Sequence, residues 1–435
     1  MSDVGKSAVI TSPPRTSALP GVIALSGSPG SRHYFSGTPG RMRVLGVVAA
    51  LMSLAFGLTG IFSLRAVDKA VDRAGANTAQ VVRAQALYAD LLKADASATN
   101  GFLVGGLETT DQRATYDDAM ARVVKNLAEA AKAQPADGTA LGALNQHVQA
   151  YAGYIDQARA YNRQGLPVGA QYLKLASAGL RADALPVISA VADANQERAD
   201  VELGAASNGA PVLGVGILTL MVLGAVGWWL AKRTHRYLNP ALVLAVLLVL
   251  GGVVLTFGAL RGLDQALTAV RDGPYRAAVA LASARAEAYD AKSNESLTLI
   301  ARGSGAKFET AYADSAGLVD AGLREAATAS SAQTGLVGGF GPYRTAHAAV
   351  RAADDAGNWD EAVALATTSE SGSANSAFTT FDTALTAGLD AEVADAQAAL
   401  DDRSMSWRPW LIGLTGLVAA LFGGRAMTKR IEEYR

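Results

Sequence analysis

The 435-residue chain contains no cysteine, so disulfide bonds stabilise no part of it. It also lacks the alternating β-branched pattern that is typical of strands. No nucleophile–base arrangement, phosphate-binding loop or cluster of metal ligands is present, and the four histidines are scattered, at His33, His147, His235 and His347. We expect His147 and His347 to lie on the surface. The sequence predicts no enzyme, no cofactor and no metal site.

Half of the residues are apolar, and many of them gather in four long runs. The runs are Val44–Leu64, Val212–Leu230, Leu238–Leu260 and about Trp407–Gly424. Each is about as long as a helix that crosses a hydrocarbon core of ~30 Å, and the first is too long and too far from the N-terminus to be a cleaved signal peptide. Their centres carry no ionisable residue, which argues against a pump or transporter. The sequence therefore predicts four transmembrane helices rather than buried helices of a soluble core.

Three clusters of basic residues flank the runs, and with four spans all three lie on one side of the membrane. They are Arg41 and Arg43 before the first run, Lys232, Arg233, His235 and Arg236 between the second and third, and Arg425, Lys429 and Arg430 after the last. The positive-inside rule places these clusters, and with them both termini, in the cytoplasm. Trp228 and Trp229 then mark an inner membrane interface, and Trp407 and Trp410 an outer one. We therefore predict a multi-pass protein of a bacterial cell membrane.

The runs divide the chain into segments of different character. They are a disordered cytoplasmic tail at 1–40, spans at 41–64, 210–231, 238–260 and 407–424, extracytoplasmic bundles at 65–209 and 261–406, a cytoplasmic turn at 232–237 and a cytoplasmic tail at 425–435. Residues 1–40 are rich in Ser, Pro and Gly, and bury too little apolar surface to offset the entropy of ordering. The predicted fold class is an all-α membrane protein.

The two external segments consist of helix-forming residues, with apolar positions three and four apart. Breaks are expected at 105–106, 135–138 and 165–167 in the first segment, and near 302–305, 334–342 and 357–358 in the second. Each segment is therefore predicted to form a four-helix bundle whose first and last helices continue into the membrane.

The two halves also resemble each other residue by residue. Tyr116, Asp118, Leu127, Glu129, Ala130 and Ala131 match Tyr312, Asp314, Leu323, Glu325, Ala326 and Ala327 in order and spacing, and Tyr151, Arg159 and Gly165 match Tyr343, Arg351 and Gly357. Each half has the order span, bundle, span. We predict that the bundles are tandem copies, related by internal duplication, that lie side by side.

If the bundles bind a small ligand, the polar residues of their long first helices are the expected place. Lys93, Ser97 and Thr99 align with Lys292, Ser296 and Thr298. Lys and Ser four apart share one helical face, here ~45 Å from the membrane at about 1.5 Å per residue. A cation with hydroxyl groups suits a carboxylate. A solvated helix face explains the same residues more simply, so both interpretations stay open.

Only short ordered elements are expected in the cytoplasm. A cytoplasmic partner is therefore predicted to bind at Lys232, Arg233 and Arg236 of the central turn and at Ile431, Glu432 and Tyr434 of the C-terminal tail. The positive charges also anchor the spans to anionic lipid. We predict that deleting Ile431–Arg435 leaves membrane insertion intact and weakens binding of that partner, most plausibly a protein kinase.

In length, layout, duplication and composition, residues 41–435 resemble the GlnX family of actinobacterial four-span membrane proteins. This resemblance implies an outside partner, a lipoprotein that binds glutamine, glutamate or aspartate, and an inside partner, the soluble protein kinase G. The external bundles also resemble the sensory domains of bacterial chemoreceptors, in which arginines read an amino-acid carboxylate, whereas the comparable depth here offers Lys93 and Lys292. The implied function is amino-acid sensing by a transmembrane signal transducer, with no role for nucleic acid. The alternative is a membrane scaffold or assembly factor that does not switch.

Overall fold

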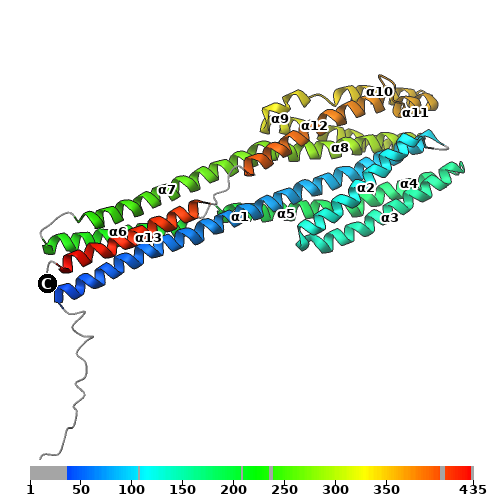
Figure 1. Ribbon diagram of the computed structural model, residues 1–435. Coiled ribbons are helices and arrows are strands. Elements are labelled where there is room, and N and C mark those ends of the chain that lie inside the picture. The colour runs from blue at the N-terminus through cyan, green and yellow to red at the C-terminus, as the bar shows by residue number, and fades with distance from the viewer. Residues whose placement is uncertain (1–36, 106–107, 207–208, 235–238, 402–406, 433–435) are drawn as a thin grey trace, which may run out of the picture.

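The computed structural model describes residues 37–105, 108–206, 209–234, 239–401 and 407–432, and none of these residues lies in a strand. The predicted all-α fold is therefore confirmed. The molecule is elongated, with the apolar helices at one end and the two helical bundles at the other (Figure 1). The predicted disordered tail lies outside the described residues up to position 36, and its last residues already belong to the first helix, which begins at Gly37.

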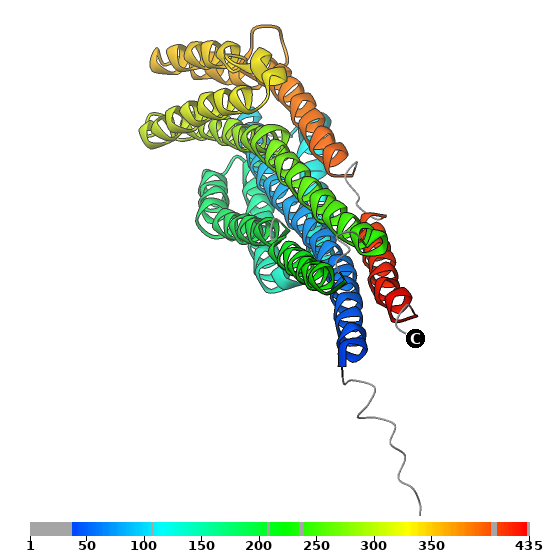
Figure 2. The same cartoon turned by 90° about the vertical axis from the view of Figure 1, so that its left-hand side faces the viewer.

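Four helical segments are long and apolar enough to cross a membrane. They belong to α1 (Gly37–Val104), α6 (Ala210–Thr234), α7 (Pro240–Val270) and α13 (Arg408–Glu432), which gather at one end of the molecule in both views (Figures 1 and 2). The side chains on the outside of this group are large and apolar; Leu51, Phe62, Met221, Val254 and Leu421 are all more than half exposed. A continuous apolar surface of this kind suits lipid rather than water, which supports a multi-pass membrane protein.

Small residues bring the membrane helices into backbone contact. A Cβ atom on Gly416 of α13 would lie 2.4 Å from the Cα atom of Gly57 of α1. The buried ring of Phe56 lies 3.0 Å from the position of a Cβ atom on both Gly216 of α6 and Gly252 of α7. Close approach at small residues maximises van der Waals contact between helices that gain no hydrophobic energy from one another in lipid.

The first bundle consists of the distal part of α1 with α2 (Thr110–Ala133), α3 (Gly138–Arg163), α4 (Val168–Gly179) and α5 (Leu185–Ala206). A 3₁₀ turn, η1 (Pro135–Asp137), precedes α3, and a π-helical turn, η2 (Leu180–Ala184), joins α4 to α5. Helix α1 has 68 residues and runs without a break from the membrane segment to the far end of the bundle, roughly 100 Å at about 1.5 Å per residue. The span and the bundle therefore share one rigid element.

The second bundle consists of α8 (Arg276–Ile300), α9 (Ala306–Ala329), α10 (Gly341–Asp355), α11 (Trp359–Thr367) and α12 (Ala374–Asp401), with a 3₁₀ helix, η4 (Ser331–Leu336), before α10. A π-helical turn, η3 (Arg271–Tyr275), joins it to α7. The helices end near the predicted positions, and Gly165 and Gly357 follow α3 and α10 with φ values of 66° and 82° that suit glycine. The interruption at 368–373, between α11 and α12, is additional.

One apolar core extends through both bundles. Helix α8 packs against α1 on one side and against α9 and α12 on others. It is therefore buried almost all round, and alanine is the commonest of its buried residues, as at Ala277, Ala284, Ala288 and Ala291. Because α1 and α8 are in contact, the bundles lie side by side. The internal duplication stays a prediction.

Candidate functional site

Charged side chains are buried where α1 packs against α8. Asp95 of α1 is 0% exposed. Its Oδ1 atom accepts hydrogen bonds from Ser177 at 2.6 Å and Tyr151 at 3.4 Å. Its Oδ2 atom accepts hydrogen bonds from Arg181 at 2.9 Å and Ser293 at 2.7 Å. Four donors therefore surround one carboxylate that is completely removed from water.

Arg181 connects this carboxylate to the second bundle. Its Nε and Nη2 atoms lie 2.9 and 2.6 Å from Oδ1 of Asp290, on α8. Asp290 Oδ2 also accepts hydrogen bonds from Asn294 and Ser315, at 2.8 Å each. Burial by itself lowers the pKa of Arg181, but Asp95 and Asp290 more than offset this effect and raise it. We call Asp95, Arg181 and Asp290, with these hydrogen-bond partners, the Arg181 cluster.

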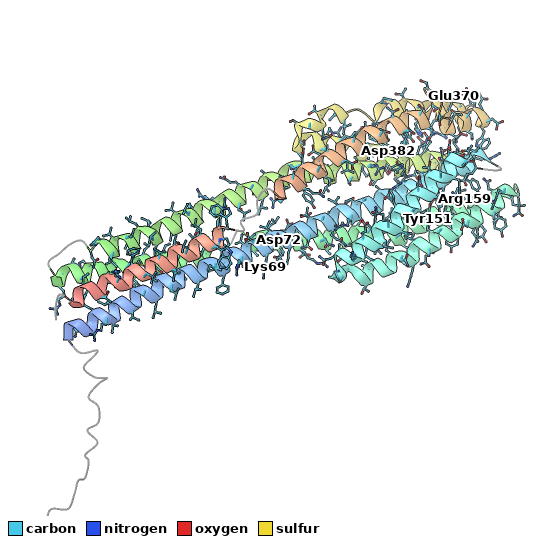
Figure 3. All side chains as sticks on the ribbon, in the orientation of Figure 1. Lys69, Asp72, Tyr151, Arg159, Glu370 and Asp382 are labelled. Atoms are coloured by element: carbon cyan, nitrogen blue, oxygen red, sulfur yellow. The ribbon has the colours of Figure 1, made fainter. Side chains whose placement is uncertain are left out.

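A second cluster has the opposite arrangement of charge. Asp382, on α12, accepts hydrogen bonds from Arg285 at 2.8 Å and Tyr289 at 2.6 Å, both on α8, and lies 3.5 Å from Nζ of Lys93 on α1. Burial tends to raise the pKa of Asp382, but Arg285 and Lys93 lower it overall, and burial lowers the pKa of Lys93. These four residues form the Asp382 cluster, of which Figure 3 labels Asp382. Each bundle thus contributes one charged residue, Arg181 in the first and Asp382 in the second, that contacts oppositely charged side chains on both α1 and α8.

A third group of charges lies inside the second bundle. Nζ of Lys292 is 2.7 Å from Glu295 and donates to the carbonyl oxygen of Ala366 at 3.0 Å. The ring nitrogens of His347 lie 2.9 Å from Glu295 and 3.1 Å from Glu309. Burial alone lowers the pKa of His347, but the hydrogen bonds to both glutamates raise it above 6.5. The Lys292 and His347 cations together lower the pKa of Glu295, although burial opposes this.

The prediction that His347 lies on the surface is wrong. The side chain is 5% exposed, and its ring stacks on Tyr312 with 3.5 Å between the ring centroids. Two carboxylates and an aromatic face replace the water that a surface histidine would have. His147, by contrast, is partly exposed.

The four predicted ligand-binding residues lie among these clusters, and they already have protein partners. Lys93 contacts Asp382, and Lys292 is buried against Glu295. Ser97 donates to the carbonyl oxygen of Gln112 at 3.3 Å, and Ser296 to that of Lys292 at 3.4 Å. A solvated helix face is the wrong interpretation for Lys292, whose side chain is only 4% exposed. Direct ligand binding at these residues stays a prediction.

The predicted partner-binding residues lie at the opposite end of the molecule. Lys232 and Arg233 are exposed in the last turn of α6, and Nζ of Lys232 lies 5.0 Å from the ring centroid of Trp228. Ile431 and Glu432 end α13, but their side chains, with Arg236 and Tyr434, lie outside what the structure describes. At the other membrane interface, Trp410 is 60% exposed and lies under the guanidinium group of Arg65.

The turn η3 makes a bend that α1 lacks. Gly273 has φ −105° and ψ −109°, and Pro274 follows it, so the helical backbone is interrupted just beyond the membrane segment of α7. The Tyr275 hydroxyl donates to Gln196 of α5 at 2.7 Å. An open groove of about 520 Å³ extends from Gln196 past η3 to Glu325. This groove therefore lies directly beside the bend between α7 and α8.

Sequence reasoning missed Arg181, Asp290 and Asp382. One signal was present for Asp95, since it follows Leu91, Leu92 and Ala94 in a stretch otherwise suited to a buried helix. No comparable signal identifies its partners, because they belong to other helices. Among the described residues, no group of three or more His, Asp or Glu side chains is arranged to hold a metal ion.

The first bundle, which contains Asp95 and Arg181, is also the part of the chain with a known counterpart. Residues 70–204 match the family model of the actinobacterial sensor domain. The matched region covers the distal part of α1, all of α2, α3 and α4, and α5 up to residue 204. The match supports a sensor protein of the actinobacterial type, and a sensing role. No curated protein and no solved structure matches the chain, and the resemblance to the GlnX family remains a hypothesis.

Proposed function

We propose that the chain is a transmembrane signal transducer. The bundles receive an extracytoplasmic signal, either an amino acid or an amino-acid-binding lipoprotein, and the membrane helices pass it to a cytoplasmic Ser/Thr kinase. No catalytic step belongs to the chain itself. The observation that carries the proposal is the continuity of α1. This one unbroken helix contains a membrane segment and Asp95 of the Arg181 cluster, and it packs against helices of both bundles.

The proposed orientation has both termini in the cytoplasm. The beginning of α7 and the end of α13 meet where Asn239 donates to the carbonyl oxygen of Ala426 at 3.0 Å. Arg41, Arg43, Lys232, Arg233 and Arg425 therefore lie at the same end of the membrane bundle, which supports a cytoplasmic position for that end under the positive-inside rule. Because the chain has no cysteine, single cysteines can report on the orientation without background. Positions 136 and 356, both exposed in the bundles, should be labelled from outside in intact cells, and position 235 should not.

The signal would travel as a displacement of α1 against its neighbours. The Arg181 and Asp382 clusters hold α1 and α8 in one register through directional contacts, which an apolar interface would not do. Displacing α8 about η3 would therefore move α1 as well. In the membrane, α1 contacts α13 at Gly57 and Gly416, so the movement reaches the C-terminal segment.

A cross-link between α1 and α13 tests this mechanism. A Cβ atom on Gly423 would lie 3.6 Å from Cβ of Ala49, within the range of about 3.5–4.5 Å that a disulfide needs. In permeabilised cells that carry Ala49→Cys/Gly423→Cys, the protein should respond to added glutamate with changed Ser/Thr phosphorylation when reduced. Oxidation should abolish that response.

The single variant Ala49→Cys, treated with the same oxidant, is the matched control and should respond like the wild type. A response that persists in the fully oxidised double variant contradicts transmission between α1 and α13. The rival function is a membrane scaffold that holds its partners without switching. It predicts phosphorylation that depends on the presence of the protein but on neither glutamate nor the cross-link.

A further inference from the structure

A cavity of about 230 Å³ lies at the far end of the first bundle. Its wall consists of Gly101, Phe102, Glu108, Arg113, Arg159, Asn162 and Arg163. These residues come from the last turn of α1, the connection to α2, the first turns of α2 and the last turns of α3. At roughly 30 Å³ per water molecule, the cavity holds only a small solute. Figure 3 shows Arg159 in this part of the bundle, far from the membrane helices.

The residues of the cavity wall carry an excess of positive charge, since three guanidinium groups accompany one carboxylate. Arg113 is exposed and held by Asp117, with Nε 3.0 and 3.1 Å from its two oxygens. Arg163 is exposed and makes no ion pair with another described residue. Arg159 is different, because its side chain is only 11% exposed and its Cζ lies 4.0 Å from the centroid of the Tyr116 ring.

Arg159 has fewer partners than its burial requires. Its Nη2 atom donates to Glu108 at 3.0 Å, but Nε and Nη1 are buried without any hydrogen-bond partner. Unsatisfied buried donors are rare in native structures and costly, so they need an explanation. Arg351, which the sequence comparison pairs with Arg159, has three carboxylate partners: Glu309, Asp354 and Asp355. The shortage of acceptors is therefore particular to the first bundle.

The carboxylate that Arg159 does contact lies directly against the α1 backbone. A Cβ atom on Gly101 would come within 2.6 Å of Oε1 of Glu108, so a larger residue at this position would force the carboxylate to shift. The cavity therefore already contains one carboxylate, that of Glu108, bound to the guanidinium group of Arg159. The guanidinium fork suits planar carboxylates, with which it makes paired, charge-assisted hydrogen bonds.

We propose that this cavity binds a small organic carboxylate, held by Arg159 and Arg163. Phe102 provides an apolar wall for a short carbon chain. In a step that rests on the proposed function, the bound carboxylate acts on the last turn of α1 and so on the helix that enters the membrane. Glu108 competes with the ligand for Arg159.

Calorimetric titration of the full-length protein in lipid nanodiscs tests the site, with succinate as probe. Succinate should bind saturably, and succinamide, its neutral counterpart of nearly the same size, should not. Arg159→Gln should weaken succinate binding about 10- to 100-fold, the range expected for loss of charge-assisted hydrogen bonds. Glu108→Gln should strengthen it, because the competing charge is removed while the amide oxygen still accepts a hydrogen bond.

Two further variants separate binding from folding. Arg163→Gln, at an exposed position, should weaken succinate binding without lowering the thermal unfolding temperature. Arg73→Gln removes a surface arginine of the same bundle that pairs with Glu202, and it should leave the affinity unchanged. No saturable succinate binding to the wild type, binding of inorganic phosphate in its place, or equal affinities of the wild type and both cavity arginine variants would overturn the proposal. Succinate binding without any phosphorylation response refutes the step from this cavity to α1 and leaves the binding site standing, whereas the transducer function itself is refuted by the cross-linking experiment above.

Discussion

Replacing Arg181 by glutamine should weaken the contact between the two bundles. The guanidinium group is the only cation that contacts both Asp95 and Asp290 among the described residues. Without it, the Asp95 carboxylate, which is 0% exposed, keeps hydrogen bonds from Ser177 and Ser293 but has no compensating charge. Removing one partner of a buried ion pair costs about 3–5 kcal/mol, because the remaining charge stays buried.

The retained hydroxyl donors place the expected cost near the lower end, at about 3 kcal/mol. At about 2 °C per kcal/mol, this corresponds to a decrease of roughly 6 °C in the unfolding temperature. Arg276→Gln is the matched control, because Arg276 pairs with Glu325 at the surface, where both side chains are at least half exposed. A pair of that kind contributes at most about 1 kcal/mol.

Hydrogen exchange of the full-length protein in nanodiscs locates the effect, since it reports local opening free energies along the chain. Arg181→Gln should accelerate exchange around Asp95 in α1 and around Asp290 in α8. Asp95→Asn/Arg181→Gln should be more stable than the sum of the single costs predicts, because the double variant buries no unpaired carboxylate at position 95. Costs that simply add, or a single variant no less stable than Arg276→Gln, would refute the ionic role of the cluster.

Three other perturbations test separate parts of the molecule. The pKa of His347 in the folded protein is raised above 6.5, so the stability that its protonated ring contributes is complete below about pH 6.5 and is lost as the pH rises through the folded pKa. In melting curves between about pH 6 and 9, the unfolding temperature should therefore fall less for His347→Gln than for the wild type. Gly416→Ala should separate α1 from α13 and cost about 1–3 kcal/mol, whereas Gly424→Ala, which meets no atom within 4 Å, should be neutral in the same unfolding assay. Deleting residues 431–435 should leave the amount of protein in the membrane unchanged and reduce recovery of the cytoplasmic kinase on co-purification; equal recovery would remove this tail from the mechanism.

The helical layout was largely predictable because it depends on local properties of the sequence. Four charge-free apolar runs predict membrane segments through transfer free energy alone. Gly165 and Gly357 mark helix ends because few other residues adopt their backbone conformation without strain. The break at 368–373 was also accessible in principle, since Ser369, Glu370, Ser371 and Gly372 form a polar turn-like stretch.

The clusters were not predictable because their members meet only through tertiary structure. Arg181 lies 86 residues from Asp95 and 109 from Asp290 along the chain. Helical periodicity places a charge on a face but does not say what covers that face. Lys93 and Lys292 illustrate the limit, because their alignment in the sequence suggested one shared role and the structure gives them different partners.

The arrangement of charge is the structural reason why we propose a transducer rather than a scaffold. In the first bundle a cation, Arg181, contacts an aspartate on each long helix; in the second an anion, Asp382, contacts cations on each long helix. Apolar side chains of similar volume commonly hold helices together at least as firmly as buried ion pairs do, so stability alone does not require these charges. We infer that these charges fix how α1 and α8 are aligned along their length. A fixed register is of most use where one of the two helices can bend, and α8 follows the interrupted turn η3 whereas α1 runs straight into the membrane.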